Sequence, residues 1–258
     1  MQDLKIGYLQ TELHWQDRQR NRQMLEKKAR QAEDSYDVLI LPEMFDTGFS
    51  MTPEQIGEQT ASKTTSWMLE LAAKLKSAVC GSVMEKVENR YYNRFYWATA
   101  EGILLHYDKK HLFRMGREPR HYSAGSEKII ISYKGWKILP MICYDLRFPV
   151  WSANYNENGK PAYDMLIYVA NWPGSRKDAW LSLLKARALE NQSYCIGVNR
   201  VGRDKNRLVY SGDSVAFNYR GEIIVQCAPH LENNVIFTAS WDDLHKFREK
   251  FPVYKDWQ

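Results

Sequence analysis

Apolar residues along this chain change their spacing several times, which predicts a mixture of strands and helices. Short apolar runs at residues 4–9 and 37–41 are typical of strands, and the second is apolar at its last four positions, as in a strand buried on both faces. Residues 15–33 and 64–76 have the spacing of helices. The apolar face of the second helix carries Trp67, Met68, Leu71, Ala72 and Leu75.

The rest of the chain continues this alternation and then becomes richer in strand pairs. Strand patterns recur at residues 79–84, 91–98, 102–107, 128–133, 136–142, 164–170, 193–199, 213–217, 222–226 and 235–239, with helices at 176–191 and from Trp241 onward. Strands that alternate with helices and then give way to hairpins indicate an α/β protein with mixed sheets and helices packed outside them. No repeat or linker-like stretch divides the sequence, so we expect a single domain over residues 1–258.

Composition narrows the class of protein. The 258 residues are 44% hydrophobic and 26% charged, which excludes an intrinsically disordered chain. The net charge of +5, from 36 Lys and Arg against 31 Asp and Glu, is too small to indicate nucleic-acid binding. No apolar run approaches the roughly 20 residues that span a bilayer, and the first residues lack the apolar core of a signal peptide. We therefore expect a soluble protein that binds neither nucleic acid nor a membrane.

The four cysteines are widely spaced and form no CxxC motif. This spacing predicts neither a disulfide framework nor a zinc site, and it favours a reducing, cytoplasmic location. Cys80, Cys195 and Cys227 lie inside apolar runs, where a free cysteine is usually a small core residue. Cys143 differs because it ends an apolar strand and polar residues follow it. A thiolate at such a strand end is held rigidly and is favoured by nearby backbone N–H groups, so Cys143 is a candidate nucleophile, although a buried structural cysteine fits the same pattern.

Two other candidates also follow predicted strands. Glu43 comes just after the run that ends at Leu41, at the kind of sheet edge where open α/β folds place ligands, and partial desolvation there makes a carboxylate a better base. Lys109 follows the strand at 102–107 and could neutralise an oxyanion. Each feature alone also fits a loop carboxylate or a solvated basic loop. Together the three candidates supply the nucleophile, base and cation that cysteine-based acyl transfer requires.

The segment from residue 109 to 121 is locally basic. It holds five Lys and Arg against one acid, Glu118. A local excess of positive charge favours an anionic substrate, although a solvated basic loop has the same composition.

The candidates lie within ordered motifs through which the chain resembles the nitrilase superfamily, the carbon–nitrogen hydrolases, from Lys5 to about Ala239. The motifs are Leu41-Pro42-Glu43, Lys109-Lys110-His111-Leu112-Phe113, Cys143-Tyr144-Asp145-Leu146-Arg147-Phe148-Pro149, Ala170-Asn171-Trp172-Pro173 and Ala186-Arg187-Ala188-Leu189-Glu190-Asn191. The resemblance implies an αββα sandwich, a four-layer fold with two mixed β-sheets flanked by helices. It also implies a homodimer formed through helices, no metal and no organic cofactor.

The resemblance further implies the catalytic residues. The family's glutamate, lysine and cysteine fall on Glu43, Lys109 and Cys143. A second glutamate that many members use falls on Glu118, the only acid in its loop. The family's usual Pro-Gly after this loop is Ala124-Gly125 here.

The segment Pro42-Glu43-Met44-Phe45-Asp46-Thr47-Gly48-Phe49-Ser50 is similar to the ω-amidase branch. Members of that branch hydrolyse the terminal amide of small 2-oxo acid amides such as 2-oxoglutaramate and 2-oxosuccinamate. We therefore expect a cysteine-dependent amidase that releases ammonia and forms a thioester intermediate. A sister amidase or carbamoylase with the same catalytic residues, or a non-catalytic interaction module that kept the fold, are the alternatives.

An anionic amide substrate also needs residues that bind it. Its carboxylate requires a cationic anchor, best an arginine, and the candidates are Arg114, Arg117, Arg147 and Arg176. The Tyr144 backbone N–H is expected to hold the oxyanion, and Asn171 and Trp172 to line the pocket wall because they follow a buried strand.

Overall fold

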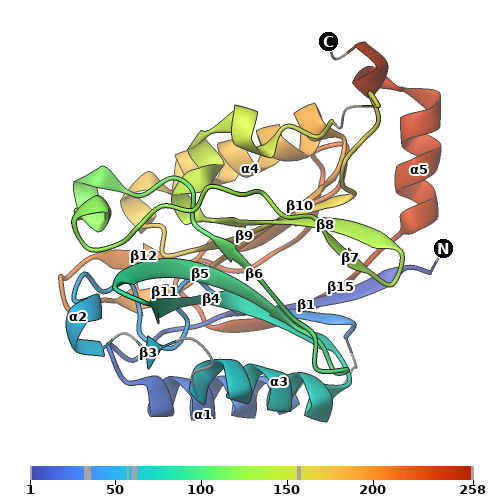
Figure 1. The fold of residues 1–258 in the computed structure, drawn as a ribbon. Coiled ribbons are helices and arrows are strands. Elements are labelled where there is room, and N and C mark those ends of the chain that lie inside the picture. Colours follow the sequence, from blue (N-terminus) through green and yellow to red (C-terminus); the bar gives the residue numbers. More distant parts are fainter. Residues whose placement is uncertain (1, 32–35, 57, 60–62, 156–157, 257–258) are drawn as a thin grey trace.

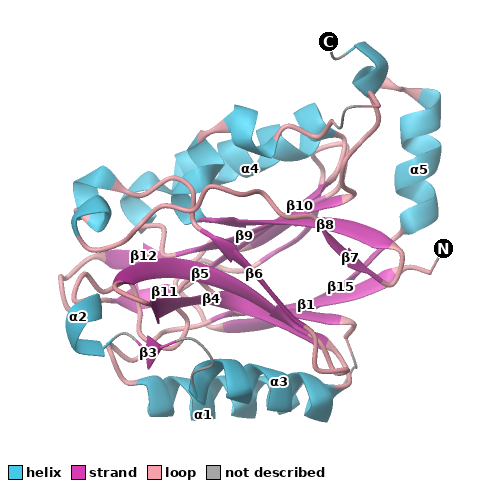
Figure 2. Ribbon diagram, in the orientation of Figure 1, coloured by secondary structure: helices cyan, strands magenta, loops and turns pink. Residues whose placement is uncertain are grey.

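Two mixed β-sheets packed face to face, with helices on their outer faces, form the body of the molecule (Figures 1 and 2). This computed structural model describes residues 2–31, 36–56, 58–59, 63–155 and 158–256. The arrangement is the αββα sandwich that the sequence predicted, so this prediction is confirmed. Within the described residues, no helix has the length and apolarity needed to cross a membrane.

The first sheet has the strand order β15-β1-β2-β4-β5-β6, with β3 paired to β4. Its strands are β1 (Leu4–Gln10), β2 (Val38–Ile40), β3 (Glu58–Gln59), β4 (Ala78–Val87), β5 (Arg90–Ala98), β6 (Leu104–Asp108) and β15 (Asn233–Ala239). The central strands β1, β2 and β4 are parallel, and β5, β6 and β15 add antiparallel pairs. The outer face of this sheet is covered by α1 (Arg18–Arg30) and α3 (Lys63–Leu75), with α2 (Pro53–Ile56) at one end (Figure 1).

The apolar run at β2 is explained by burial on both faces. Val38 and Ile40 belong to the core between the two sheets, and Leu39 and Leu41 belong to the core beneath α1 and α3. Because alternate strand residues point to opposite faces, a strand covered on both sides has no polar position.

The second sheet has the order β14-β13-β10-β9-β8-β7. Its strands are β7 (Ile131–Tyr133), β8 (Trp136–Ile142), β9 (Met165–Ala170), β10 (Tyr194–Asn199), β13 (Val215–Phe217) and β14 (Ile223–Gln226). Helix α4 (Lys177–Asn191) covers its outer face. The helix approaches so closely that a Cβ at Gly197 of β10 would lie 2.3 Å from Leu184 and 2.6 Å from Trp180. Only glycine fits this contact.

A C-terminal helix, α5 (Trp241–Lys250), packs at the end of the sandwich near the N-terminus (Figure 1). The side chain of Ser240 caps it by accepting a hydrogen bond from Asp243 N. On its inner face, Arg248 Nη1 donates to Asp164 Oδ1 at 2.8 Å. A buried ion pair therefore ties this helix to the loop that precedes β9.

Several elements differ from the sequence-based expectation. The helix expected at residues 15–33 begins at Arg18, where Asp17 accepts a hydrogen bond from Arg20 N, and its expected end lies outside the described residues. The strands expected at 128–133 and 213–217 are shorter, at Ile131–Tyr133 and Val215–Phe217. A two-stranded ribbon, β11 (Val201–Arg203) and β12 (Val209–Ser211), was not expected.

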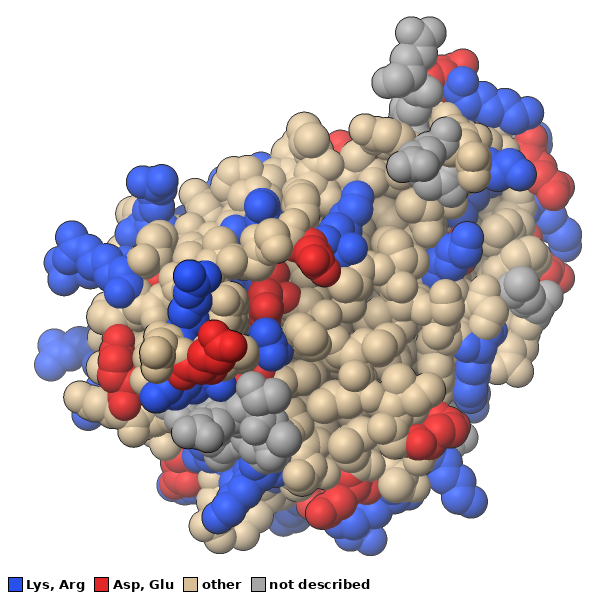
Figure 3. Space-filling view, in the orientation of Figure 1, with Lys and Arg blue, Asp and Glu red and all other residues tan. Residues whose placement is uncertain are grey.

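In the face drawn in Figure 3, Lys and Arg are mixed with Asp and Glu along the margin and over the left half. The centre of this face is largely uncharged. The chain's small excess of positive charge is therefore not gathered into one patch on this side of the molecule.

Candidate active site

Four of the candidate residues lie where strands of the two sheets end. Glu43 follows β2, and Lys109 directly follows β6, both in the first sheet. Cys143 directly follows β8, and Asn171 directly follows β9, both in the second sheet. The site is therefore built across the boundary between the two sheets.

Lys109 lies between two carboxylates. Its Nζ is 2.9 Å from Glu43 Oε1 and 3.0 Å from both carboxylate oxygens of Glu118. All three side chains are fully buried, with 0% of their surface exposed. The structure thus brings Glu118 to the same cluster as Glu43 and Lys109, which the sequence could suggest only by resemblance.

Backbone and side-chain donors complete this cluster. Asn171 N donates to Glu43 Oε2 at 2.7 Å, and Phe113 N donates to Glu118 Oε2 at 2.6 Å. Asn93, a residue that the sequence analysis did not single out, donates from Nδ2 to Glu43 Oε1 at 2.8 Å and to Glu118 Oε1 at 3.3 Å. Both carboxylates are therefore surrounded by donors, which is an environment suited to their ionised forms.

Burial and the charge of Lys109 or its carboxylate partners shift the pKa values of these groups in opposite directions. Burial lowers the pKa of the Lys109 ammonium, but the charges of Glu118 and Glu43 outweigh burial and hold this pKa above its ordinary value. Burial raises the pKa of the Glu118 carboxyl, and Lys109 only partly opposes it. Burial, and then the charge of Glu43, raise the pKa of the Cys143 thiol, with Lys109 opposing them. The resting thiol is therefore protonated, and a nearby base is needed to activate it.

Cys143 occupies a tight turn. Its φ of +45° lies in the left-handed region that non-glycine residues rarely adopt, and it opens a short 3-10 helix, Cys143–Arg147. Asp145 holds this turn, because its Oδ2 accepts hydrogen bonds from Ile142 N at 3.1 Å and from Tyr107 OH at 2.8 Å. Such strained positions are often found at functional sites.

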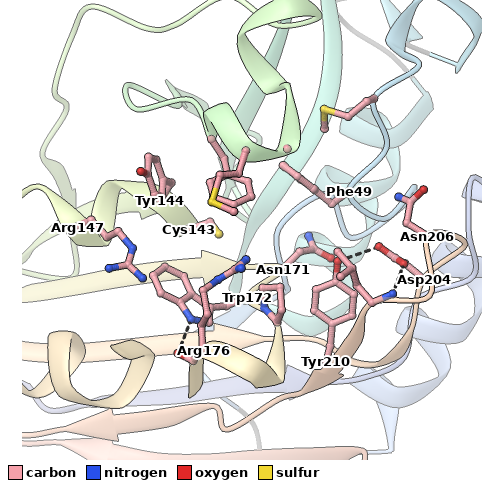
Figure 4. A pocket seen from close by; sticks show the side chains of 16 residues that line it. Phe49, Cys143, Tyr144, Arg147, Asn171, Trp172, Arg176, Asp204, Asn206 and Tyr210 are labelled. Carbon is pink, nitrogen blue, oxygen red and sulfur yellow. Dashed lines mark hydrogen bonds between the residues drawn. The ribbon is translucent and has the colours of Figure 1, made fainter. Parts of the chain in front are cut away.

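A cavity of about 290 Å³ opens beside Cys143 (Figure 4). The cysteine is 8% exposed and lines this cavity, whereas Cys80 and Cys195 are fully buried. Five aromatic residues contribute to the cavity walls, Phe49, Phe113, Tyr144, Trp172 and Tyr210. Phe49 also lies under the buried cluster, with its ring centroid 5.2 Å from Lys109 Nζ. The buried charges therefore lie just behind the cavity wall.

Two of the four candidate arginines line the cavity. The guanidinium of Arg176 lies 5.4 Å from the ring centroid of Phe113, and that of Arg147 lies 5.0 Å from that of Trp172. Arg176 is half-buried and in Figure 4 extends in the direction of Cys143, whereas Arg147 is exposed. Neither pairs with a carboxylate in the part of the chain that the structure describes.

The other two arginines lie elsewhere. Arg117 lines a neighbouring polar hollow together with Lys205 and Asn206, and Arg114 lines neither space. All five residues that the sequence analysis assigned to substrate binding line the cavity with Cys143, namely Tyr144, Arg147, Asn171, Trp172 and Arg176. Asp204 and Tyr210 also line it and were not expected, because they come from the ribbon of β11 and β12.

The described residues contain no group of three or more His, Cys, Asp or Glu side chains placed to hold a metal ion. All four cysteines are free thiols. The ionisable groups that the structure places at this site include the Cys143 thiol, the Lys109 ammonium, the carboxyl groups of Glu43, Glu118 and Asp204, and the guanidinium groups of Arg147 and Arg176.

A family model and several known proteins match most of this chain. The family model described as carbon-nitrogen hydrolase matches residues 5–243. The chain is 42% identical over 257 residues to a protein of Escherichia coli K12 named omega-amidase YafV, covering 99% of this chain and 97% of that protein. It is 32% identical over 235 residues to the 2-oxoglutaramate amidase of Bacillus subtilis, covering 90% and 87%.

Its fold is similar to that of a solved structure, XC1258 from Xanthomonas campestris. The TM-score is 0.96 and the identity 39%, covering all of this chain and 98% of the other. That protein is described as a CN-hydrolase superfamily member with an arsenic adduct in its active site.

Proposed function

The chain belongs to the carbon–nitrogen hydrolase family, and from this premise we propose that it is a cysteine-dependent ω-amidase acting on small 2-oxo acid amides. One observation carries the proposal: Cys143 lines a cavity with Arg176, which pairs with no carboxylate among the described residues, and lies close enough to the buried cluster of Glu43, Lys109 and Glu118 for their charges to act on its thiol. The named relatives, omega-amidase and 2-oxoglutaramate amidase, support the same substrate class.

In the first half of the reaction, the thiol attacks the amide. Glu43 takes the proton from Cys143, and the sulfur forms a bond to the amide carbon while the carbonyl electron pair moves onto oxygen. The Lys109 ammonium and the Tyr144 backbone N–H hold this oxyanion. One such donor is typically worth about 3–4 kcal/mol of barrier.

Collapse of the oxyanion then breaks the carbon–nitrogen bond. Glu43 gives its proton to the leaving nitrogen, ammonia departs, and a thioester remains on Cys143. In the second half, Glu43 takes a proton from a water molecule that Glu118 helps to position. The water oxygen bonds to the thioester carbon, the carbon–sulfur bond breaks, and the proton on Glu43 returns to the Cys143 sulfur, which releases the carboxylic acid and restores the thiol.

Arg176 is the best candidate for anchoring the substrate carboxylate. It is half-buried, lines the cavity and has no carboxylate partner among the described residues. Its guanidinium lies 5.4 Å from the Phe113 ring centroid, a cation–π contact that leaves its N–H donors available for a bidentate contact with a carboxylate. Arg147 is exposed to solvent, where an ion pair is weaker.

We also propose a cytoplasmic homodimer that forms through helices. Large apolar side chains are exposed on the helical side of the second sheet, with Val150 85% exposed and Leu189 of α4 47% exposed. The four free thiols fit a reducing compartment. Light scattering of the purified protein tests the dimer, and a monomer at micromolar concentration contradicts it.

A panel of amides tests the substrate class. The panel contains 2-oxoglutaramate, 2-oxosuccinamate, a matching carboxylate-bearing amide that lacks the 2-oxo group, a neutral alkyl amide and an N-carbamoyl amino acid. Ammonia release is measured for each compound. We expect the highest kcat/KM for the 2-oxo acid amides. Preference for the neutral amide would overturn the ω-amidase assignment, and preference for the carbamoyl compound would support the carbamoylase alternative.

A further inference from the structure

Asn93 contacts three of the four proposed catalytic residues. Its Nδ2 donates to Glu43 at 2.8 Å and to Glu118 at 3.3 Å, and its backbone oxygen accepts a hydrogen bond from Lys109 N at 3.0 Å. Asn93 lies in the middle of β5 and is fully buried. Asparagine is depleted in strands, and a buried amide is costly unless it is paired. Its presence here therefore calls for an explanation in terms of its partners.

The buried partners of Asn93 carry unequal numbers of negative and positive charges. Two buried carboxylates face one ammonium, so the cluster carries one excess negative charge when both carboxylates are ionised. A second cation would remove the excess charge but would also compete with Lys109 for the oxyanion. An amide instead gives one N–H to each carboxylate and adds no charge.

A relay of hydrogen bonds fixes which way the amide points. Met44 N donates to Ser82 Oγ at 2.9 Å, and Ser82 Oγ donates to Asn93 Oδ1 at 2.8 Å. Ionised carboxylates only accept hydrogen bonds, so the Asn93 NH₂ group faces Glu43 and Glu118. Its Oδ1 is then on the side of Ser82, where it accepts the hydroxyl hydrogen.

We propose that Asn93 is a positioning residue that orients Glu43 and Glu118 beside a single lysine and favours the ionised form of Glu118, with Ser82 holding its amide in place. The effect on turnover rests on the proposed amidase function. The effect on protonation is independent of it, because it follows from the hydrogen bonds alone. Loss of the Asn93 N–H donor raises the pKa of the Glu118 carboxyl further, since a hydrogen bond to the charged form favours that form.

The test compares Asn93→Leu with Asn154→Leu. Asn154 is also fully buried, and its Nδ2 donates at 2.9 Å to two backbone oxygens, those of Tyr163 and Asn191. Its acceptors do not titrate in this range. The two variants therefore lose similar hydrogen bonds, but only one of them loses bonds to ionisable groups.

Thermal unfolding at pH 5 and pH 8 gives a measurement that needs no activity. In Asn93→Leu the folded Glu118 carboxyl binds a proton more readily than in the parent protein, so the loss of stability grows as pH rises. We expect its fall in Tm to be larger at pH 8 than at pH 5 by about 2–4 °C, and that of Asn154→Leu to be equal at both. Equal falls at both pH values for Asn93→Leu overturn the proposal.

Kinetics give the second measurement. We expect Asn93→Leu to lower kcat about ten- to hundredfold with little change in KM, and to move the acid limb of the kcat/KM profile upward by about 1–2 pH units. Ser82→Ala, a smaller change, should move the limb in the same direction by less and serves if Asn93→Leu does not fold. An unmoved limb in both variants overturns the proposal. Absence of amide hydrolysis in the parent protein instead refutes the proposed function and leaves the unfolding test in force.

Discussion

Asp145 accepts two hydrogen bonds from His111, from the backbone N–H at 2.9 Å and from Nδ1 at 2.8 Å. His111 lies two residues after Lys109, and Asp145 lies two residues after Cys143. The contact therefore joins the turn that carries the ammonium to the turn that carries the thiol. Stacking of the His111 ring on Phe148, with ring centroids 3.7 Å apart, holds the same junction.

Asp145→Asn should loosen this junction. The carboxylate accepts four hydrogen bonds, from His111 twice, Tyr107 and Ile142, and an amide would turn N–H donors toward two of these donors. Each buried group left unpaired costs about 1–3 kcal/mol. We expect Tm to fall by several degrees and kcat by about tenfold or more, measured by calorimetry and ammonia release. Asp178→Asn, an exposed change in the first turn of α4, is the control and should alter neither.

Cys143→Ala should abolish turnover, because no other thiol lines the cavity. Loss of a covalent nucleophile typically costs about 10⁴-fold or more in kcat. Cys80→Ala is the matched control, since Cys80 is fully buried in β4, and we expect it to keep its activity and lose some stability. Intact-mass measurement should detect an acyl adduct on the parent protein and none on Cys143→Ala. Full ammonia release by Cys143→Ala would disprove the mechanism.

Arg176→Gln should weaken the binding of anionic amides alone. A hydrogen-bonded charge pair is worth about 1.5–3 kcal/mol, which corresponds to a rise in KM of roughly ten- to hundredfold. The KM of a neutral amide should stay the same, because it makes no ion pair. Arg147→Gln serves as the comparison and should have the smaller effect. A larger rise in the KM of anionic amides for Arg147→Gln than for Arg176→Gln would contradict the assignment of Arg176 as the anchor.

Asp164→Asn should destabilise the attachment of α5 in a pH-dependent way. Burial favours the protonated carboxyl, but His245 and Arg248 outweigh burial and hold the pKa of Asp164 below its ordinary value. A lowered carboxyl pKa contributes stability above the unfolded-state pKa of about 3.9, and this contribution is lost as pH falls through the folded-state value. We therefore expect a lower Tm than the parent at pH 7 and a smaller difference below pH 4. A constant difference across this range would contradict the assigned role.

Sequence reasoning located Glu43, Lys109 and Cys143 because each follows an apolar strand, and strand ends are where α/β folds place reactive groups. It could not locate Asn93, which lies inside a strand and draws its partners from positions 50 and 25 residues away. Spacing within a strand carries no information about such distant contacts.

The choice among the four arginines was also beyond the sequence. Each of the four lies within or just after one of the recognised motifs, so the sequence does not rank them. Only the solvent exposure of each side chain in the fold separates half-buried Arg176 from exposed Arg147. The ribbon of β11 and β12 was missed because its strands have only three residues each and one of them ends in a charged residue. A period of two cannot be recognised over so few positions.

The proton acceptor and the sulfur are attached to different sheets, with Glu43 and Lys109 on one and Cys143 and Asn171 on the other. A slip of one layer past its neighbour would separate them even while every strand remained paired. Dilute denaturant should therefore abolish activity at concentrations too low to change the circular dichroism spectrum. The rate of turnover then reports how well the two sheets are aligned.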